Sequence, residues 1–196
     1  MSREEMDIDF EELREQIEVY LREENLDGFR ELFTDLHNYE QSEIFQTLSE
    51  EEQQNLYKFL SPEEVGDFFD HLELEPDEYE DLFDQIDARY AAHIIGAMQY
   101  DNAVDILNEI SREKMTTYLS LMNKDDAKEI RGLMNYEEDT AGGIMTTEYI
   151  SLKSTMPVKE ALMQVKEQAP DAETIYVIFA VNEHKQLAGV LSLRDL

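Results

Sequence analysis

The spacing of apolar residues changes once along the chain. Between about residue 7 and residue 135, apolar positions recur every three or four residues, as at Leu13, Ile17 and Leu21, which predicts amphipathic helices. From residue 148 onward, short apolar runs alternate with turn residues, and only one stretch keeps a helical period. The sequence therefore predicts a helical first part and a second part that combines strands with a helix.

Helix start signals divide the first part into short pieces. Ser49 with Glu52 and Ser61 with Glu64 form capping boxes, in which a hydroxyl and a carboxylate satisfy backbone amides at a helix start. Pro62 adds the residue that is favoured at the first helical position. Further candidate N-caps are Asp87, Asp101 and Ser111.

These starts predict helices of about three turns, which are marginal alone and are stabilised by stacking. We therefore expect a mainly α chain that begins with a superhelical array of short helices sharing one continuous core. A compact bundle is the alternative, because the apolar period is the same in both arrangements.

The second part has the order strand, helix, strand, strand. Glu148–Leu152 is a short extended stretch, and Thr174–Val181 is rich in β-branched and aromatic residues, as a buried strand would be. Leu187–Ser192 follows a polar tip and is typical of the returning strand of a hairpin. Pro157–Gln168 is predicted to be an amphipathic helix that places on one face Val158, Ala161, Leu162 and Val165.

Composition narrows the possible chemistry. The chain has 47 acidic and 16 basic residues and a net charge of -31, which repels nucleic acid phosphates and anionic membrane surfaces. Cations or basic proteins are the expected partners, although acidic helices also serve solubility alone. There is no cysteine, so disulfides and thiolate metal sites are excluded. The four histidines are scattered and no hydrolase or phosphate-loop motif occurs, so we expect no enzyme.

Most of the negative charge lies in the helical part. Residues 1–135 hold 37 acidic and 11 basic residues, whereas the remaining 61 residues hold 10 and 5. The longest apolar run, Ile175–Val181, has seven residues, far short of the roughly 20 that a membrane helix requires. We expect that this stretch of sequence does not span a membrane and is itself soluble.

Three segments together carry a resemblance to a known family. Gly189–Leu196 (GVLSLRDL) resembles the end of a CBS motif, in which a hairpin strand closes with glycine, two apolar residues, a hydroxyl residue and then an aspartate. Combined with Tyr136–Tyr149 (YEEDTAGGIMTTEY) and Ala169–Tyr176 (APDAETIY), it resembles the cytosolic part of the MgtE family of magnesium transport proteins. The resemblance covers the whole chain.

The resemblance implies a division into three segments. Residues 1–135 would form the acidic helical N-type domain, residues 136–147 a joint, and residues 148–196 a first CBS motif that is incomplete. The family places a second CBS motif and a dimeric transmembrane pore after this region, so the implied partners are that motif, that pore and a second copy joined through CBS domains. The implied location is the cytoplasmic face of the cell membrane.

The resemblance also implies a function and a metal site. The region would sense Mg²⁺, which would bridge the N and CBS domains and close the pore. Mg²⁺ prefers oxygen ligands and keeps several waters, so a loose acidic interface suits it. Asp101 and Asp105 lie four residues apart and can share a helix face.

Matching the family register makes Asp67 a further implied metal ligand, and Gly143 another through its backbone carbonyl. Asp101 is equally a candidate N-cap, and Gly142–Gly143 equally a turn that needs positive backbone angles.

A second implied ligand is ATP or another adenine nucleotide in the cleft of a complete CBS pair. By that analogy the nucleotide candidates are Ser192, Arg194 and Asp195, and their alternative is a hairpin end with a local helix cap. Two other functions stay open. The chain would be a CBS nucleotide sensor whose helices only transmit a signal, or a helical scaffold that binds a basic protein.

Overall fold

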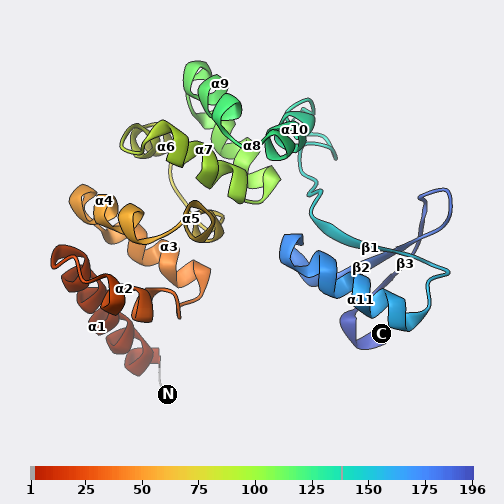
Figure 1. Cartoon of the computed structure of the whole chain (residues 1–196), viewed down its shortest axis with the longest axis horizontal. Helices are drawn as coiled ribbons and strands as arrows, with labels where there is room; N and C mark the ends of the chain where they lie inside the picture. The colour runs from red at the N-terminus through yellow and green to blue at the C-terminus, as the bar shows by residue number, and fades with distance from the viewer. Residues whose placement is uncertain (1–2, 138) are drawn as a thin grey trace. The chain divides into compact units, whose positions relative to one another are not determined.

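The computed structural model describes residues 3–137 and 139–196 and shows a mainly α chain with one three-stranded sheet (Figure 1). This confirms the predicted fold class. The strands are β1 (Tyr149–Lys153), β2 (Thr174–Val181) and β3 (Leu187–Leu191), and two short 3₁₀ turns are η1 (Ala169–Asp171) and η2 (Leu193–Asp195). The helices are α1 (Arg3–Arg22), α2 (Leu26–Phe33), α3 (Asn38–Thr47), α4 (Glu50–Phe59), α5 (Pro62–Phe69), α6 (Pro76–Asp84), α7 (Ala88–Ala97), α8 (Tyr100–Glu109), α9 (Arg112–Leu121), α10 (Lys124–Leu133) and α11 (Val158–Gln168).

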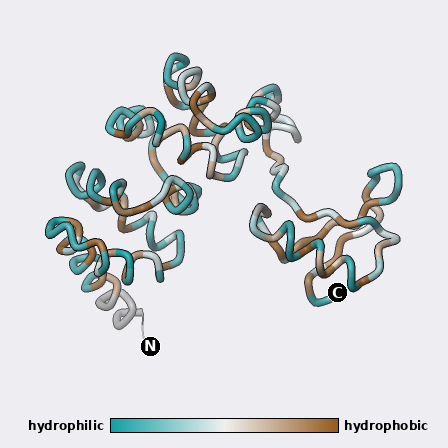
Figure 2. The backbone as a smooth tube through the Cα atoms, in the orientation of Figure 1, coloured by the Kyte–Doolittle hydropathy of each residue, from teal (hydrophilic) through white to brown (hydrophobic). Residues whose placement is uncertain are grey.

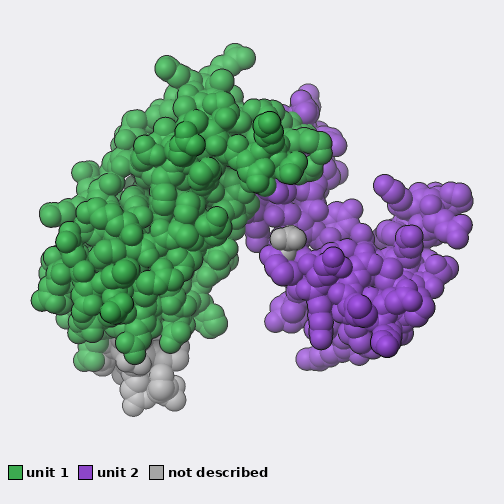
Figure 3. Space-filling model, viewed as in Figure 1, with its two compact units in different colours: residues 1–98, 102–132 green, residues 99–101, 133–196 purple. Residues whose placement is uncertain are grey.

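The chain forms two compact units. We call the first the helical unit, which contains the residues up to Met98 together with Asn102–Gly132, and the second the sheet unit, which contains Gln99–Asp101 and Leu133–Leu196 (Figure 3). The first residues of α8 therefore belong to the sheet unit, although most of that helix belongs to the helical unit. The predicted bounds 1–135, 136–147 and 148–196 stay a prediction.

A two-helix repeat builds the helical unit. Helices α2, α4, α6, α8 and α10 begin at residues 26, 50, 76, 100 and 124, and α3, α5, α7 and α9 begin at residues 38, 62, 88 and 112. The repeat is therefore 24 to 26 residues long. Figure 1 shows these short helices stacked one after another, as the predicted superhelical array requires. Each pair buries its apolar side only by packing on its neighbours.

Phenylalanine rings fill the centre of this stack. Phe68 lies with its ring centroid 5.7 Å from that of Phe33, 5.5 Å from that of Phe45 and 5.2 Å from that of Phe69. In Figure 2 the hydrophobic segments alternate with hydrophilic ones along each helix of the array. The largest fully buried side chains are aromatic residues contributed by four different helices, namely Phe29, Phe33, Phe45, Phe68, Phe69 and Phe83.

Polar side chains join successive repeats by binding helix ends. Tyr90 Oη donates to the carbonyl of Leu60 over 2.8 Å, and Asn55 Nδ2 donates to the carbonyl of Leu21 over 3.1 Å. The last carbonyls of a helix have no partner within it, so such bonds satisfy groups that would otherwise be buried unpaired. The stack is thus held by polar contacts at the helix ends as well as by its apolar core.

The predicted N-caps are confirmed with one exception. Ser49 and Ser61 form complete capping boxes at α4 and α5, and Asp87 accepts hydrogen bonds from the second and third amides of α7. Ser111 occupies the cap position of α9 without a cap hydrogen bond from its side chain. Asp101 as an N-cap is wrong, because α8 begins one residue before it, at Tyr100.

The sheet unit is a parallel pair extended by a hairpin. The strand order is β1-β2-β3; β1 runs parallel to β2 with Ile150 opposite Ile178, and β3 runs antiparallel to β2. Helix α11 covers one face through a small core of Ile150, Leu152, Ala161, Val165 and Ile178.

Two expectations for this unit need correction. Val158 does not join the core face of α11, since it is 54% exposed. Strand β2 is not buried throughout, because Tyr176 and Val177 are exposed and Ile178 is its one fully buried residue. The reason is that, among the residues the structure describes, helix α11 packs against one face of the sheet and leaves the other without a helix. In the described part of the chain, none of the helices has the length and apolarity that crossing a membrane requires.

Candidate functional site

The start of α8 carries two of the four predicted metal positions. Asp101 is the second residue of the helix, and Asp105 follows one turn later on the same side. The amide of Tyr100, the first helical residue, donates a hydrogen bond of 2.6 Å to Glu148 Oε2. A carboxylate 48 residues away therefore caps this helix, which explains why Asp101 does not.

The Asp101 carboxylate is incompletely satisfied. Its Oδ1 atom is buried and has no hydrogen-bond partner. An unpaired buried carboxylate oxygen is costly, since it gives up water without a replacement. Next to it, Asn102 Nδ2 donates to Asp70 Oδ1 over 3.1 Å, which fixes α8 against the end of α5 within the helical unit. The neighbouring Asn102 thus has a partner in the helical unit, whereas one oxygen of Asp101 lacks a donor.

Asp67 lies on α5 among other acids. Asp67 is exposed by surface area, yet the protein around its carboxyl group removes part of the solvation of the charged form. Loss of solvation, and then repulsion from Glu64 and Glu63, raise the pKa of Asp67 above its ordinary value. A bound cation would instead lower the pKa of Asp67. Asp67 is thus an acid whose charged form is disfavoured by its present surroundings.

The turn that contains Gly143 is tightly folded. The amide of Gly143 donates to the carbonyl of Thr140 over 3.0 Å and also lies 3.2 Å from Thr140 Oγ1. The amide is thus used within the turn, and the carbonyl is the backbone group of Gly143 that would contact a metal ion. The expectation of positive backbone angles is wrong, because no described glycine has a positive φ. Gly142 instead permits close packing, since a Cβ there would lie 2.1 Å from an atom of the Tyr136 ring.

The predicted metal residues do not form a ready-made ion cage. Among the residues that the structure describes, no three acidic or histidine side chains converge in a way that could hold a metal ion. Asp101 and Asp105 share a helix, Asp67 lies on another, and Gly143 lies in a turn. An ion there would keep several of its waters, which is the usual behaviour of Mg²⁺.

The predicted nucleotide residues form a local cap. Asp195 Oδ2 accepts hydrogen bonds from the amide of Ser192 over 2.7 Å and from its hydroxyl over 2.8 Å. These bonds lower the pKa of Asp195. Arg194 is exposed beside them. The geometry therefore matches the alternative of a hairpin end with a helix cap. The exposed Arg194 adds no observation that favours a ligand.

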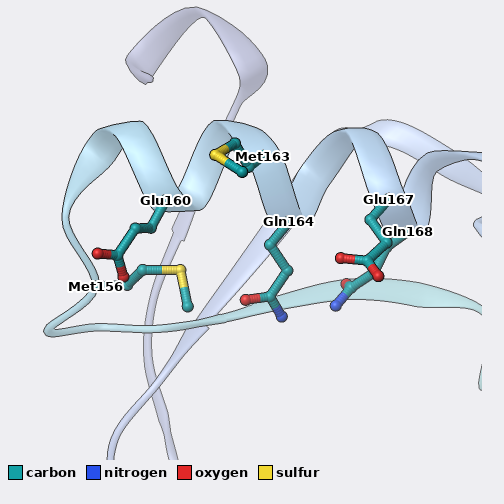
Figure 4. Close-up of a pocket in the computed structure, with 6 residues that line it drawn as sticks. All are labelled: Met156, Glu160, Met163, Gln164, Glu167 and Gln168. Atoms are coloured by element: carbon teal, nitrogen blue, oxygen red, sulfur yellow. The ribbon is translucent and has the colours of Figure 1, made fainter.

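A surface groove of about 550 Å³ runs along α11 (Figure 4). Gln164 and Gln168 at its side reach β1: Gln164 Nε2 donates to the Ser151 carbonyl and the Ser151 amide donates to Gln168 Oε1, each over 3.3 Å. These bonds satisfy the free edge of β1, which would otherwise offer unpaired backbone groups. Met163, 65% exposed, also lines the groove. None of the predicted site residues lies there.

Glu148 is the residue at α8 that sequence reasoning missed. It lies just before β1, and no local pattern connects it with residue 100. The signal that could have raised the question was the absence of a favoured cap residue directly before Tyr100, where the chain has Gln99.

An array of two-helix repeats followed by a strand, helix, strand, strand unit defines a helical-repeat protein joined to a CBS-type fold. The model of the MgtE intracellular N domain matches residues 36–139, and the model of the CBS domain matches residues 141–196. The chain therefore belongs to the MgtE family of magnesium transporters.

Curated relatives and solved structures agree with this assignment. The chain is 41% identical to the magnesium transporter MgtE of Enterococcus faecalis over 95% of its own length and 42% of that protein, and 30% identical to that of Bacillus subtilis over 95% and 41%. It thus spans about two fifths of these relatives. The crystal structure of the soluble part of a magnesium transporter matches with a TM-score of 0.90 and 41% identity, covering 95% of this chain and 73% of that one. A crystal structure of the cytosolic domain of the Mg²⁺ channel MgtE in complex with ATP matches with a TM-score of 0.78 and 29% identity, covering 93% and 74%.

Proposed function

We propose that this region senses Mg²⁺ and regulates an attached magnesium channel. At low Mg²⁺ the acidic helices repel acidic neighbours, and at high Mg²⁺ ions bound by both the helical and the CBS parts favour the closed pore. Asp67, Asp101, Asp105 and the Gly143 carbonyl are the proposed ligands. A ligand shifts such an equilibrium only through its differential affinity, and several weak sites together can supply it.

The observation that carries the proposal is the buried Asp101 Oδ1 atom without a hydrogen-bond partner. A Mg²⁺ ion or one of its bound waters would supply the missing contact. The raised pKa of Asp67 points the same way, because loss of solvation and repulsion from Glu64 and Glu63 disfavour the charged carboxylate, and a bound cation would relieve that repulsion.

The few basic residues of the helical unit support the proposal, because several hold the fold together. Arg30 binds Glu64 over 2.6 Å and lowers the pKa of that carboxyl. With 37 acids against 11 bases in residues 1–135, most carboxylates have no basic residue to pair with. External cations are the remaining source of neutralisation. Other bases held in ion pairs are Arg22 with Glu18 and Glu52, and Lys114 with Glu80 and Asp84.

Small-angle scattering tests the proposal on this chain and on one extended through the second CBS motif. Millimolar Mg²⁺ should reduce the radius of gyration of the extended protein, and Asp101→Asn should weaken that response. Asp81→Asn is the matched control, since it removes the same charge from an exposed position on α6. An unchanged radius in millimolar Mg²⁺ would refute the sensor mechanism.

Adenine nucleotide binding is a second candidate function. A solved relative is described in complex with ATP. Ser192, Arg194 and Asp195 are the proposed contacts, and the exposed ring of Tyr176 offers a surface on which a base could stack. ATP binding that persists without Mg²⁺ and is lost in Arg194→Ala would favour this role.

We further propose how the open face of the sheet is used. Val190 is 58% exposed and Val177 39%, on the side of the sheet opposite the α11 core. Exposed apolar patches mark interaction surfaces. A second CBS motif would cover this face, a second copy would associate through the CBS domains, and the membrane pore would follow on the same protein.

A further inference from the structure

Helix α8 obtains its cap differently from the helices at the same position in other repeats. In α2 and α4 the residue directly before the helix supplies the cap, since Asn25 Oδ1 accepts from Gly28 N over 3.1 Å and Ser49 forms a capping box. Before α10, Asn123 Oδ1 accepts from Asp125 N over 3.0 Å. At α8 the amide of the first helical residue is instead bound by Glu148.

Glu148 is itself held firmly in place. Its amide donates to Thr146 Oγ1 over 3.1 Å, and its carbonyl accepts from the Glu173 amide over 2.8 Å. The carboxylate therefore reaches the Tyr100 amide from an anchored backbone. Negative charge at a helix start is also favourable, because the helix dipole is positive there.

The cap supplied by Glu148 determines what Asp101 can do. Aspartate is among the best N-cap residues, and if α8 began two residues later, at Asn102, Asp101 would occupy the cap position and bind backbone amides of its own helix. Because Glu148 satisfies Tyr100, the helix starts earlier and Asp101 lies at the second helical position with its Oδ1 atom unpaired. The same side chain is thus either a helix cap or a carboxylate with one unpaired oxygen.

We infer that Glu148 is a positioning residue for Asp101: by capping α8 it keeps the Asp101 carboxylate out of the cap role, so that this carboxylate is available to a cation. This rests on the proposed Mg²⁺ function. Glu148 does not need to touch the ion, because its Oε2 atom is already bound to the Tyr100 amide.

Two substitutions separate positioning from direct binding. Glu148→Gln keeps an oxygen that can accept from the Tyr100 amide but removes the charge, whereas Glu148→Ala removes both. We expect Glu148→Ala to weaken Mg²⁺ binding at α8 about tenfold, as loss of an outer-shell partner does, and Glu148→Gln to weaken it less than about threefold. Glu160→Ala, an exposed carboxylate of the sheet unit, is the control and should match the parent chain.

A rescue variant makes the test specific. Gln99→Ser places at α8 the cap residue that Ser49 provides at α4. In the double variant Glu148→Ala with Gln99→Ser, the helix should again start before Asp101, and most of the Mg²⁺ affinity should return. A defect caused by misfolding of the sheet unit would not be rescued in this way.

The measurements are amide NMR on the whole chain, with Mg²⁺ as the probe and hydrogen exchange of the Tyr100 amide as the cap readout. Exchange should accelerate about tenfold or more in Glu148→Ala and remain slow in Glu148→Gln. Unchanged exchange in Glu148→Ala would show that no cap exists.

Equal loss of Mg²⁺ binding in Glu148→Gln and Asp101→Asn would make Glu148 a direct ligand and overturn the positioning role. No Mg²⁺ shift at α8 in the parent chain would overturn the sensor proposal and this role with it, while the exchange data would still report the cap separately.

Discussion

The helical unit and the sheet unit differ in how completely they bury their apolar residues. In the helical unit, six phenylalanines are at most 1% exposed. In the sheet unit, Ile150 and Ile178 are fully buried, but Leu187 is 64% exposed and Val190 58%. The first unit encloses its core between successive repeats, whereas the described part of the second has a helix, α11, on only one face of its sheet. Burial of apolar surface is the main stabilising contribution, so the two units should respond differently to the same kind of change.

Truncating a buried ring should give the largest difference. Phe68→Ala removes contacts with three neighbouring rings and should lower the free energy of unfolding of the helical unit by about 3–5 kcal/mol. Val190→Ala on the open sheet face should change stability by less than about 0.5 kcal/mol. Denaturant unfolding followed by unit-resolved amide signals measures both. Equal effects would remove the distinction between the units.

Acid should weaken the helical unit through Glu52. Burial alone would raise the pKa of this carboxyl, but hydrogen bonds from Ser49 and Arg22 outweigh it, and the pKa is lowered in the folded state. The resulting stability is present above the unfolded pKa, near 4.3, and is lost as the pH falls through the folded value. Glu52→Ala should therefore cost about 1–2 kcal/mol at pH 7, by loss of cap and ion pair, and progressively less below about pH 4. A cost that does not change with pH would contradict the ion-pair explanation.

Among the described residues, each unit has one non-glycine residue with positive φ, which allows a direct comparison. Glu24 follows α1 with φ 53°, and Lys185 lies in the β2–β3 turn with φ 59°, both in the left-handed region that favours glycine. Glu24→Gly should raise the stability of the helical unit by about 1 kcal/mol, and Lys185→Gly should act in the same direction on the sheet unit. Glu23→Gly, at a neighbouring residue without positive φ, is the control and should not stabilise. Thermal unfolding of the three variants measures the effect.

A pair of tyrosines should give the smallest effects. Tyr57 Oη is buried without a hydrogen-bond partner, and burial raises the pKa of this phenol strongly. Tyr57→Phe should leave stability unchanged or raise it by up to about 1 kcal/mol, because it removes an unsatisfied polar group. Tyr90→Phe should instead lower stability by about 1 kcal/mol, since it removes the bond to the Leu60 carbonyl. A loss in Tyr57→Phe as large as in Tyr90→Phe would indicate a partner for the Tyr57 hydroxyl.

Local signals in the sequence predicted what local chemistry determines. Neighbouring residues alone indicate the capping boxes at Ser49 and Ser61 and the strand at Thr174–Val181, and the structure confirms all three. Helix α6 was missed because its cap position holds Glu75, a residue not favoured there, although Pro76 follows it. The start of α8 could not be predicted from nearby residues, because its cap comes from Glu148 in another part of the chain.

The proposed site was accessible to sequence reasoning only in part. Spacing could place Asp101 and Asp105 on one helix face, but not show that one oxygen of Asp101 is buried and unpaired. Likewise the two glycines at 142 and 143 predicted a turn, whereas the reason for Gly142 is the ring of Tyr136 packed against it. The first feature depends on tertiary contacts and the second on how the chain folds back between Tyr136 and Gly142, and no apolar period encodes either.

The bonds between successive repeats bear on how the protein is made. The side-chain bonds from Tyr90 to Leu60 and from Tyr118 to Phe83 span 30 and 35 residues. Short sequence separation between contacting residues favours fast folding, and domains generally fold during synthesis from the amino terminus onward. Each new helix pair can therefore dock on the pair made just before it, and the ribosome need not release the chain before the array takes shape.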